Sequence, residues 1–187
     1  MASITSTNGF VLAGGQSRRM GRDKASMPWG RLSLLDHMLS LLSTVADPVR
    51  VVGRAEFPDR ILNKGPLGGI LTALEASDRE ANLFLAVDLP LLTPGFLRFF
   101  HSRFLASSKA LLACRVGGSF PLCLGIRRSL AETAAQRVAA NRLAVGAFIE
   151  DVAAEIVEET ELGSLGFDAR MFVNMNTPQD WPDPKLL

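Results

Sequence analysis

A short apolar run near the N-terminus leads into a segment rich in glycine and in cationic side chains. The apolar run is Phe10 to Ala13, and the segment after it contains Gly14, Gly15, Arg18, Arg19, Gly21 and Lys24. Glycine adopts positive φ angles and has no Cβ, so the backbone can turn sharply and approach a ligand closely. Backbone N–H groups in such a turn converge on anions, and cationic side chains add full charges. The segment therefore predicts a phosphate-binding loop at the carboxyl end of a first β-strand, where open α/β sheets place ligands.

The spacing of the glycines excludes two common phosphate-binding loops. A Walker A loop requires G-x-x-x-x-G-K-S/T, but Gly15 and Gly21 are one residue too far apart and two residues separate Gly21 from Lys24. The dinucleotide fingerprint G-x-G-x-x-G is excluded because Gly14 and Gly15 are adjacent. A strand before the segment and a helix after it favour a ligand site over a solvated basic turn, which is the alternative.

A second candidate group follows the cleanest apolar run of the chain. Leu83 to Val87 reads as a buried strand, and Asp88 comes directly after it. A carboxylate there is costly when unpaired, and it faces the same edge of the sheet as the glycine-rich loop. Because Mg²⁺ takes one or two carboxylates together with substrate phosphates, Asp88 is the predicted metal ligand. A cap of a helix or turn is the alternative role.

Two further segments carry groups that suit a small-molecule site. Pro66 fits the first turn of a helix that begins near Gly65 and continues through Leu67, and glycines there allow close approach of a ligand or close helix–sheet packing. Asn174 and Asn176 alternate on an extended segment and therefore point the same way. Their amides offer donors and acceptors to the edge of a heterocycle. The alternative for both asparagines is the capping of turns.

The glycine-rich segment also carries a family resemblance. It reads Leu12-Ala13-Gly14-Gly15-x-Ser17-x-Arg19-Met20-Gly21-x-Asp23-Lys24, which resembles the L-A-G-G-x-S-x-R-M-G-x-D-K loop of a nucleotidyltransferase superfamily. Within that superfamily the chain is most similar to the molybdenum cofactor guanylyltransferase family. The segments at 65–70, 87–90 and 173–178 resemble that family's G-P-L-x-G-I, V-D-x-P and V-N-x-N-T-P motifs. The resemblance extends from about Phe10 to Trp181.

The resemblance implies an activity and a set of site residues. The activity is transfer of GMP from GTP to the phosphate of molybdopterin or the molybdenum cofactor, with release of pyrophosphate and with Mg²⁺ bound by Asp88. Implied catalytic residues are Lys24, Asp88 and Arg19. Implied nucleotide-binding residues are Leu12, Ala13, Gly14, Gly15, Gly21, Lys24, Asp59, Gly65, Pro66, Leu67 and Asp88. Implied acceptor-binding residues are Arg19, Ser119, Asn174 and Asn176, with Arg115 as a weaker candidate. Arg137 and Arg142 could also reach the phosphate of the acceptor, but the favoured alternative places both on the solvated face of a helix.

The acceptor and the base of the nucleotide leave alternatives open. A phosphate monoester is already ionised near neutral pH, since its second pKa is near ~6, so no general base is required and none stands out. Gly53 and Arg54 stand where guanylyl relatives have an asparagine that would read the base, and Asp59 lies at an unusual spacing from Gly65. The alternatives are a cytidylyl or sugar-phosphate nucleotidyltransferase and a non-catalytic nucleotide-binding regulator. An NTP hydrolase is disfavoured because the Walker A lysine–serine pair is missing.

Composition and charge exclude several classes of partner. The 187 residues, 48% hydrophobic and 21% charged, match an ordinary globular protein. Twenty Lys and Arg against 19 Asp and Glu give a net charge of +1, which argues against a general binder of nucleic acid or anionic membranes. We expect small-molecule substrates and transient contact with proteins that make or receive the cofactor. Cys114 and Cys123 read as buried free thiols, and the N-terminus lacks a signal-peptide pattern, so we expect a cytoplasmic location.

The order of the apolar segments predicts an α/β fold. We expect one three-layer Rossmann-like domain over 1–187, in which residues 1–8 form a flexible tail. Helices are expected on both faces of a mostly parallel sheet. Strands are expected at 10–13, 48–52, 83–87, 110–115, 121–126 and 154–158, a turn at 25–31, and helices after Ser33, Gly65 and Thr93 and within 128–149. Because 116–119 reads as a hairpin turn, one strand of the sheet is expected to be antiparallel.

Overall fold

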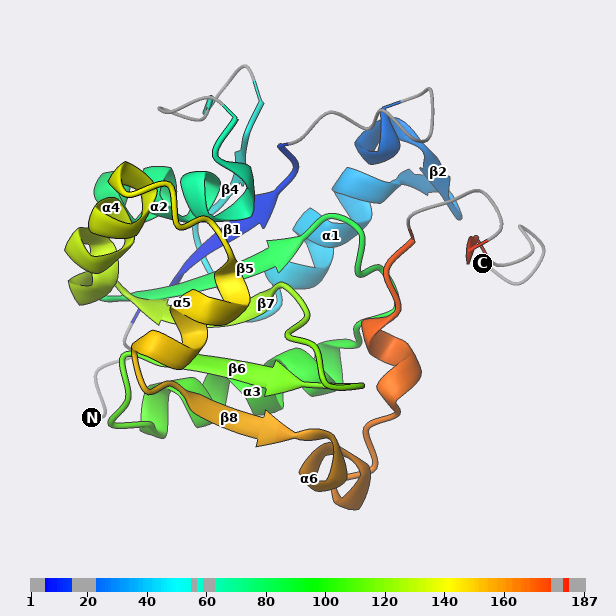
Figure 1. Ribbon diagram of the computed structural model, residues 1–187. Coiled ribbons are helices and arrows are strands. Elements are labelled where there is room, and N and C mark those ends of the chain that lie inside the picture. The colour runs from blue at the N-terminus through cyan, green and yellow to red at the C-terminus, as the bar shows by residue number, and fades with distance from the viewer. Residues whose placement is uncertain (1–5, 15–22, 55–56, 59–62, 176–179, 182–187) are drawn as a thin grey trace.

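A six-stranded sheet forms the centre of the molecule (Figure 1). A computed structural model describes residues 6–14, 23–54, 57–58, 63–175 and 180–181, and within these ranges the strand order is β4-β1-β5-β7-β6-β8. The strands are β1 (Asn8–Leu12), β4 (Val49–Val52), β5 (Ala81–Ala86), β6 (Leu111–Arg115), β7 (Cys123–Arg127) and β8 (Glu155–Glu158). A separate antiparallel pair consists of β2 (Pro28–Trp29) and β3 (Leu32–Ser33).

The sheet is parallel except for one strand, as the hairpin at 116–119 predicted. β1 pairs in parallel with β4 and β5, and β6 pairs in parallel with β8. β7 runs antiparallel to both of its neighbours, β5 and β6. The register places Leu12 beside Val52 on one side and beside Ala86 on the other. The carboxyl ends of β1, β4 and β5 therefore lie at one edge of the sheet.

Helices cover both faces of the sheet, so the domain has the three layers that were expected (Figure 1). The α-helices are α1 (Leu34–Leu42), α2 (Gly65–Ala76), α3 (Pro94–Ala106), α4 (Ala131–Ala139), α5 (Val145–Asp151) and α6 (Glu159–Ser164). Short 3-10 helices span Lys24–Ser26, Arg128–Leu130 and Ala169–Phe172. α1, α3 and α6 pack on one face, and α2, α4 and α5 pack on the other.

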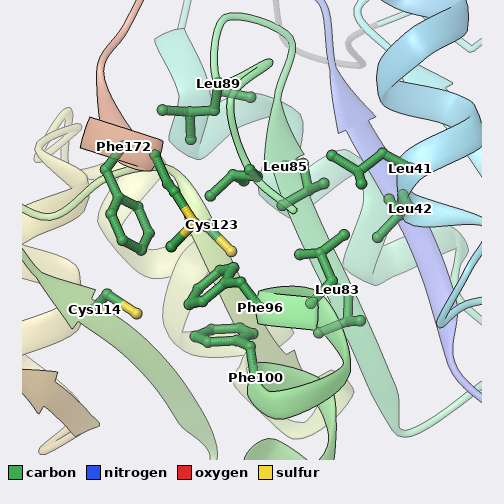
Figure 2. Packing of buried hydrophobic residues seen from close by; sticks show 14 of the residues in the cluster. Leu41, Leu42, Leu83, Leu85, Leu89, Phe96, Phe100, Cys114, Cys123 and Phe172 are labelled. Atoms are coloured by element: carbon green, nitrogen blue, oxygen red, sulfur yellow. The ribbon is translucent and has the colours of Figure 1, made fainter. Parts of the chain in front are cut away.

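The buried strands supply alternate side chains to the two apolar layers, because successive residues of a strand point to opposite faces. Phe10 and Phe84 point toward the layer of α2, and their rings stack with centroids 5.3 Å apart. Leu83 and Leu85 point the other way, toward Phe96 and further residues of α3 and α1 (Figure 2). Burial on both faces explains why these strands read as continuous apolar runs.

Local capping signals set the helix starts where the sequence predicted them. The Ser33 hydroxyl accepts a hydrogen bond from the Asp36 N–H at 3.1 Å, and the Thr93 hydroxyl accepts one from the Phe96 N–H at 3.2 Å. Each satisfies an N–H that the first helical turn leaves without a backbone partner. Pro66 stands in the first turn of α2, where a missing N–H costs nothing.

Two expectations about local structure were wrong. The predicted tail at 1–8 ends before Thr7 and Asn8, which are buried: Asn8 Nδ2 donates to Ser77 Oγ at 2.8 Å, and the polar network anchors the start of β1. Residues 1–5 lie outside the described ranges. The predicted turn at 25–31 contains part of a 3-10 helix and the short β2 strand. No prediction covered the 3-10 helix that ends at Phe172, which the Asp168 carboxylate caps.

None of the helices in the described ranges combines the length and the apolar character that a bilayer crossing requires.

Candidate functional site

The fold creates a topological switch point at the carboxyl end of β1. From β1 the chain passes through α1 to β4 on one side, and then through α2 to β5 on the other side of β1. Open α/β sheets bind ligands in the crevice beyond the carboxyl ends of such strands. The Ala13 N–H donates to the Val52 carbonyl at 3.0 Å, and the Val87 N–H donates to the Leu12 carbonyl at 3.1 Å. These bonds carry the strand pairing to the first residues of both candidate segments.

The structure brings Lys24 and Asp88, two of the predicted catalytic residues, into contact. Lys24 Nζ lies 3.3 Å from Asp88 Oδ2, although 64 residues separate them in the chain. Asp88 directly follows β5 and Val87, and Lys24 begins the 3-10 helix that follows the glycine-rich segment. Their side chains are 14% and 23% exposed, so the pair lies at the rim of the core and keeps access to solvent. An ammonium beside a carboxylate can serve a phosphate and a metal ion together.

Two contacts from distant segments hold the turn that contains Asp88. His37 Nε2 donates to the Pro90 carbonyl at 2.9 Å, and the Met175 N–H donates to the Asp88 carbonyl at 2.9 Å. Met175 is buried in a small cluster with Trp29, and this burial seats the C-terminal segment against the site. Asn174 is exposed directly before Met175. The structure therefore places one of the predicted acceptor-binding asparagines next to the Asp88 turn.

A second ion pair lies immediately before Lys24. Arg54 Nη1 donates to Asp23 Oδ2 at 2.6 Å, and Arg54 Nη2 donates to Asp23 Oδ1 at 2.5 Å. The hydrogen bonds from this guanidinium hold the pKa of Asp23 below its ordinary value, and Asp23 in turn raises the pKa of Arg54. The sequence analysis treated Arg54 only as a departure from the asparagine of guanylyl relatives and did not predict its pairing with Asp23. The pairing had a usable signal, because Arg54 follows β4 at the edge where Asp23 follows the loop of the adjacent strand β1.

Gly53 makes a close approach between two loops possible. Its φ angle is +87°, and a Cβ built on it would lie 2.4 Å from the Cα atom of Gly14. Any side chain at this position would combine a strained backbone with a backbone clash. Gly53 therefore lets the turn after β4 pack directly against the start of the glycine-rich segment.

Some of the other predicted nucleotide-binding residues are exposed and others are buried. Gly65 and Pro66 are exposed at the start of α2, which leaves their backbone open to a ligand. Leu67 is fully buried in the apolar layer with α4, so its side chain packs the core and only its backbone is available to a nucleotide. Leu12 and Ala13 are buried at the end of β1.

The predicted acceptor residues near 116–119 lie at the same edge of the sheet, at the carboxyl end of β6. Ser119 is exposed, and its N–H closes the hairpin turn by donating to the Val116 carbonyl at 3.0 Å. The Arg115 guanidinium pairs with Glu158 at 2.9 Å and lies over the ring of Phe120. Arg115 therefore stabilises the hairpin in this structure.

The sequence also assigned Arg137 either to an acceptor phosphate or to a solvated helix face, and the solvated alternative was wrong. Its side chain is 5% exposed and its guanidinium pairs with Asp151. This pair fastens α4 to α5. Five predicted site residues lie outside the described ranges, and these are Gly15, Arg19, Gly21, Asp59 and Asn176.

The described part of the site suits a metal ion that is shared with a substrate. Within the described ranges no group of three or more His, Cys, Asp or Glu side chains gathers as a metal cage. Asp88 offers one partly exposed carboxylate beside a lysine. Mg²⁺ keeps several waters and binds through one or two carboxylates plus phosphate oxygens, so this donor set fits a metal that arrives with a nucleotide.

Comparisons with known proteins identify relatives of this chain. The family model described as the MobA-like NTP transferase domain matches residues 9–155. The molybdenum cofactor guanylyltransferase of Xanthomonas euvesicatoria pv. vesicatoria is 33% identical over 181 residues, which cover 92% of this chain and 91% of that protein.

Two solved structures have similar folds. Molybdopterin-guanine dinucleotide biosynthesis protein A from Archaeoglobus fulgidus superposes with a TM-score of 0.75 at 21% identity, over 92% of this chain and 94% of that chain. Rv0371c from Mycobacterium tuberculosis H37Rv, solved in complex with manganese, has a TM-score of 0.60 at 15% identity, over 82% of this chain and 88% of that chain. Since the family model covers most of the chain, and a relative above 30% identity is matched nearly end to end, this chain belongs to the MobA-like NTP transferase family.

Proposed function

We propose that this chain, a nucleotidyltransferase, transfers GMP from GTP to the phosphate of molybdopterin or of the molybdenum cofactor and releases pyrophosphate. The observation that carries the proposal is the contact between Lys24 and Asp88 at the switch point of the sheet. The proposal is supported by the names of relatives that match nearly the whole chain.

Lys24 and Asp88 would bind different parts of a triphosphate and its cation. The Lys24 ammonium would bind phosphate oxygens of GTP, and the Asp88 carboxylate would hold a divalent cation, which we take to be Mg²⁺. Bound there, Mg²⁺ would offset the negative charge on the phosphate oxygens. Phosphoryl-type transfer depends mainly on positioning and on electrostatic stabilisation, which these residues can supply without a covalent intermediate.

The transfer step needs no general base from the protein. An oxygen of the acceptor phosphate attacks the α-phosphorus of GTP in line, and the bond from the α-phosphorus to the bridging oxygen breaks, so that pyrophosphate leaves. The attacking oxygen is already ionised near neutral pH, because the second pKa of a phosphate monoester is about 6. Residues of this chain would hold both phosphates at the right distance and would not move a proton.

On the acceptor side, we assign Asn174 and Ser119 to molybdopterin. Asn174 is exposed beside the turn that contains Asp88, and Ser119 is exposed at the same edge of the sheet. The amide of Asn174 offers both a donor and an acceptor to the edge of a pterin. The Asn174→Ala variant should raise the KM for the acceptor more than it raises the KM for GTP, and the reverse result would move Asn174 to the nucleotide side.

We also assign the activity to the cytoplasm and expect only transient protein contacts. Cys114 and Cys123 are free buried thiols, which fits a reducing compartment. The net charge of +1 fits small-molecule substrates rather than nucleic acid or membrane partners.

The first experiment compares thermal unfolding with Mg²⁺ and GTP, CTP, ATP or UTP. A ligand that binds only the folded state at ~100 Kd adds about 2.7 kcal/mol of stability. We expect a shift with GTP, followed by pyrophosphate release when molybdopterin is added. A preference for CTP would keep the chemistry and change the product. Binding without pyrophosphate release would point instead to a regulator.

Variants then test the two charged residues. Lys24→Ala and Asp88→Ala should each abolish pyrophosphate release, whereas Lys109→Ala, which removes a lysine beyond the opposite end of β6, should keep it. Release at the wild-type rate from either site variant would remove that residue from the proposed mechanism.

A further inference from the structure

The turn after β4 contacts the glycine-rich segment near both of its ends. Gly14 lies near the start of that segment and Asp23 near its end, and both residues contact this one turn. Gly53 lies against the backbone of Gly14, where a Cβ would be 2.4 Å from the Gly14 Cα atom. Arg54, the next residue, holds the Asp23 carboxylate through two hydrogen bonds. One dipeptide therefore fixes both residues.

The turn itself is rooted in the core. The Phe57 N–H donates to the Arg54 carbonyl at 3.0 Å, and the Gly53 N–H donates to the Phe57 carbonyl at 3.0 Å. The Phe57 ring stacks on the buried Phe10 of β1, with centroids 6.4 Å apart and an interplanar angle of 29°. The Arg54 side chain consequently projects from a fixed base. Two-thirds of the Arg54 side chain is buried, so contacts along the side chain hold its guanidinium in place.

The pairing reaches Lys24 through one peptide bond. Asp23 caps the 3-10 helix that starts at Lys24, because its Oδ1 accepts a hydrogen bond from the Ala25 N–H at 3.3 Å. Both terminal nitrogens of Arg54 donate hydrogen bonds to this same carboxylate. A bidentate arginine–carboxylate pair fixes orientation as well as distance. The backbone that carries Lys24 is therefore fixed relative to β4, while its ammonium extends to Asp88.

We propose that Arg54 is a positioning residue that acts through Asp23 to hold the Lys24 ammonium where the triphosphate binds. A lysine has a long, flexible stem with four carbons, so its charge is placed only as well as its backbone is placed. Misplacing a group by about 1 Å can cost ~100-fold in rate. The inference rests on the proposed function for its link to GTP, and it gives a role to Arg54 and Asp23, which that proposal leaves without one.

The test measures two quantities in the full chain. The first is the Kd for GTP with Mg²⁺ and no acceptor, obtained by calorimetry. The second is the rate at which Lys24 is acylated by a small amine-reactive reagent without nucleotide, read by mass spectrometry. The variants are Arg54→Gln, Asp23→Asn, Lys24→Ala and the double variant Arg54→Gln/Lys24→Ala. Arg103→Gln is the matched control, since it removes a partly exposed arginine that pairs with Glu155 at the opposite edge of the sheet.

If Arg54 acts through Lys24, its effect must disappear when Lys24 is absent. We expect Arg54→Gln to weaken GTP binding about fivefold, the equivalent of roughly 1 kcal/mol, and Asp23→Asn to do the same. The double variant should bind GTP as Lys24→Ala does, because effects of residues that act as one unit do not add. Acylation of Lys24 should become faster in Arg54→Gln and stay unchanged in Arg103→Gln.

A merely structural role for Arg54 gives different results. It would weaken GTP binding by the same factor in the presence and absence of Lys24, and this additivity would overturn the inference. Unchanged acylation of Lys24 in Arg54→Gln would also overturn it. If wild type binds no nucleotide while acylation still rises in Arg54→Gln, the proposed function fails and the positioning role stands. Partial rescue of GTP binding by Arg54→Lys, which restores charge without the fork, would support the role of geometry.

Discussion

At the scale of single residues, the most informative contact joins a lysine and an aspartate that follow different strands. Lys24 and Asp88 act as counter-ions for each other at the rim of the core, 3.3 Å apart. Ion pairs that retain exposure contribute little net stability, because water already solvates both charges well. Their value lies in what they can bind. A nucleotide with its cation would give the ammonium a phosphate and the carboxylate a metal.

We therefore predict that loss of either charge separates activity from stability. Lys24→Ala and Asp88→Asn should each lower the free energy of unfolding by about 1 kcal/mol or less, since the pair is partly exposed. Pyrophosphate release should nevertheless fall by at least ~100-fold, as expected when a group that stabilises the transition state is lost. Urea denaturation and a pyrophosphate assay on the same samples measure both quantities. A loss of several kcal/mol would mean that the missing activity reports unfolding.

Gly53 gives a second prediction at this scale, with a control inside the same chain. Gly53→Ala should destabilise the protein more than Gly118→Ala, although both glycines have positive φ angles, +87° and +72°. An added Cβ at Gly53 would meet the Gly14 backbone at 2.4 Å, whereas at Gly118 it would meet nothing within 4 Å. Gly118→Ala thus measures backbone strain alone, about 1 to 3 kcal/mol. Equal losses in urea denaturation would show that the backbone near Gly14 yields to the clash.

At the scale of elements, the edge strand β8 is held by a small polar network. Glu155 of β8 accepts hydrogen bonds from the Ser107 hydroxyl and from the Arg103 guanidinium, both at the end of α3. These two hydrogen bonds, first from Ser107 and then from Arg103, hold the pKa of Glu155 below its ordinary value of 4.5. The network ties the last strand of the sheet to a helix of the layer that covers it.

This lowered pKa predicts the sign of an acid effect. Because the folded state favours the ionised carboxylate, its contribution to stability is fully present above the unfolded pKa and is lost as pH falls through the folded pKa. The free energy of unfolding of wild type should therefore decline below about pH 4.5, and the decline should be shallower in Glu155→Gln. Glu150→Gln, an exposed substitution on α5, serves as the control in pH-dependent urea denaturation. Parallel curves for wild type and Glu155→Gln would contradict the assignment.

Elements whose signals are local could be predicted from the sequence. The caps at Ser33 and Thr93 need only a hydroxyl three residues before an N–H, and the structure confirms both. The apolar run before Asp88 and the hairpin turn at 116–119 likewise depend on neighbours in the chain, and both were predicted correctly. Even the single antiparallel strand follows from the hairpin, since a short turn forces its two strands to run in opposite directions.

Contacts between distant segments could not be predicted in the same way. Asp23 and Arg54 are 31 residues apart, and their places after neighbouring strands indicate a shared edge of the sheet but not the pairing itself. Thr7 and Asn8 read as part of a polar tail, but in the structure Asn8 is hydrogen-bonded to Ser77 at the C-terminal end of α2. Arg137 reads as a helix-surface charge, but its side chain is buried and pairs with Asp151 of α5. The sequence therefore predicts the edge of the sheet at which the candidate residues gather, whereas the pairs between distant residues required the structure.

At the scale of the whole molecule, burial in the apolar layers makes certain side chains unreactive. Figure 2 shows Cys114 and Cys123 within the layer that contains Phe96, Phe100 and Phe172. Burial raises the pKa of the Cys114 thiol to about 12 and raises the pKa of Cys123 well above its ordinary value. The thiolate is the reactive form, so both groups lack reactivity as long as the sheet and helices stay packed.

We predict that native protein reacts slowly with a disulfide reagent at pH 8 and that denatured protein reacts at once with two thiols per chain. The native rate should follow the opening of the fold, so a destabilising variant such as Gly53→Ala should accelerate it. Fast labelling of native wild type would contradict the burial of the thiols. The denatured sample provides the control for the number of free thiols, which the sequence fixes at two.

The small cluster beside the Asp88 turn has an optical consequence. The chain contains two tryptophans and no tyrosine, and the rings of Trp29 and Trp181 lie 5.6 Å apart with an interplanar angle of 67°. Both belong to the cluster of Met175, whose N–H donates to the Asp88 carbonyl. The intrinsic fluorescence of the entire protein thus originates at one place, next to the predicted metal ligand. At the proposed site, substrate arrival and product departure should therefore change the emission of unlabelled protein.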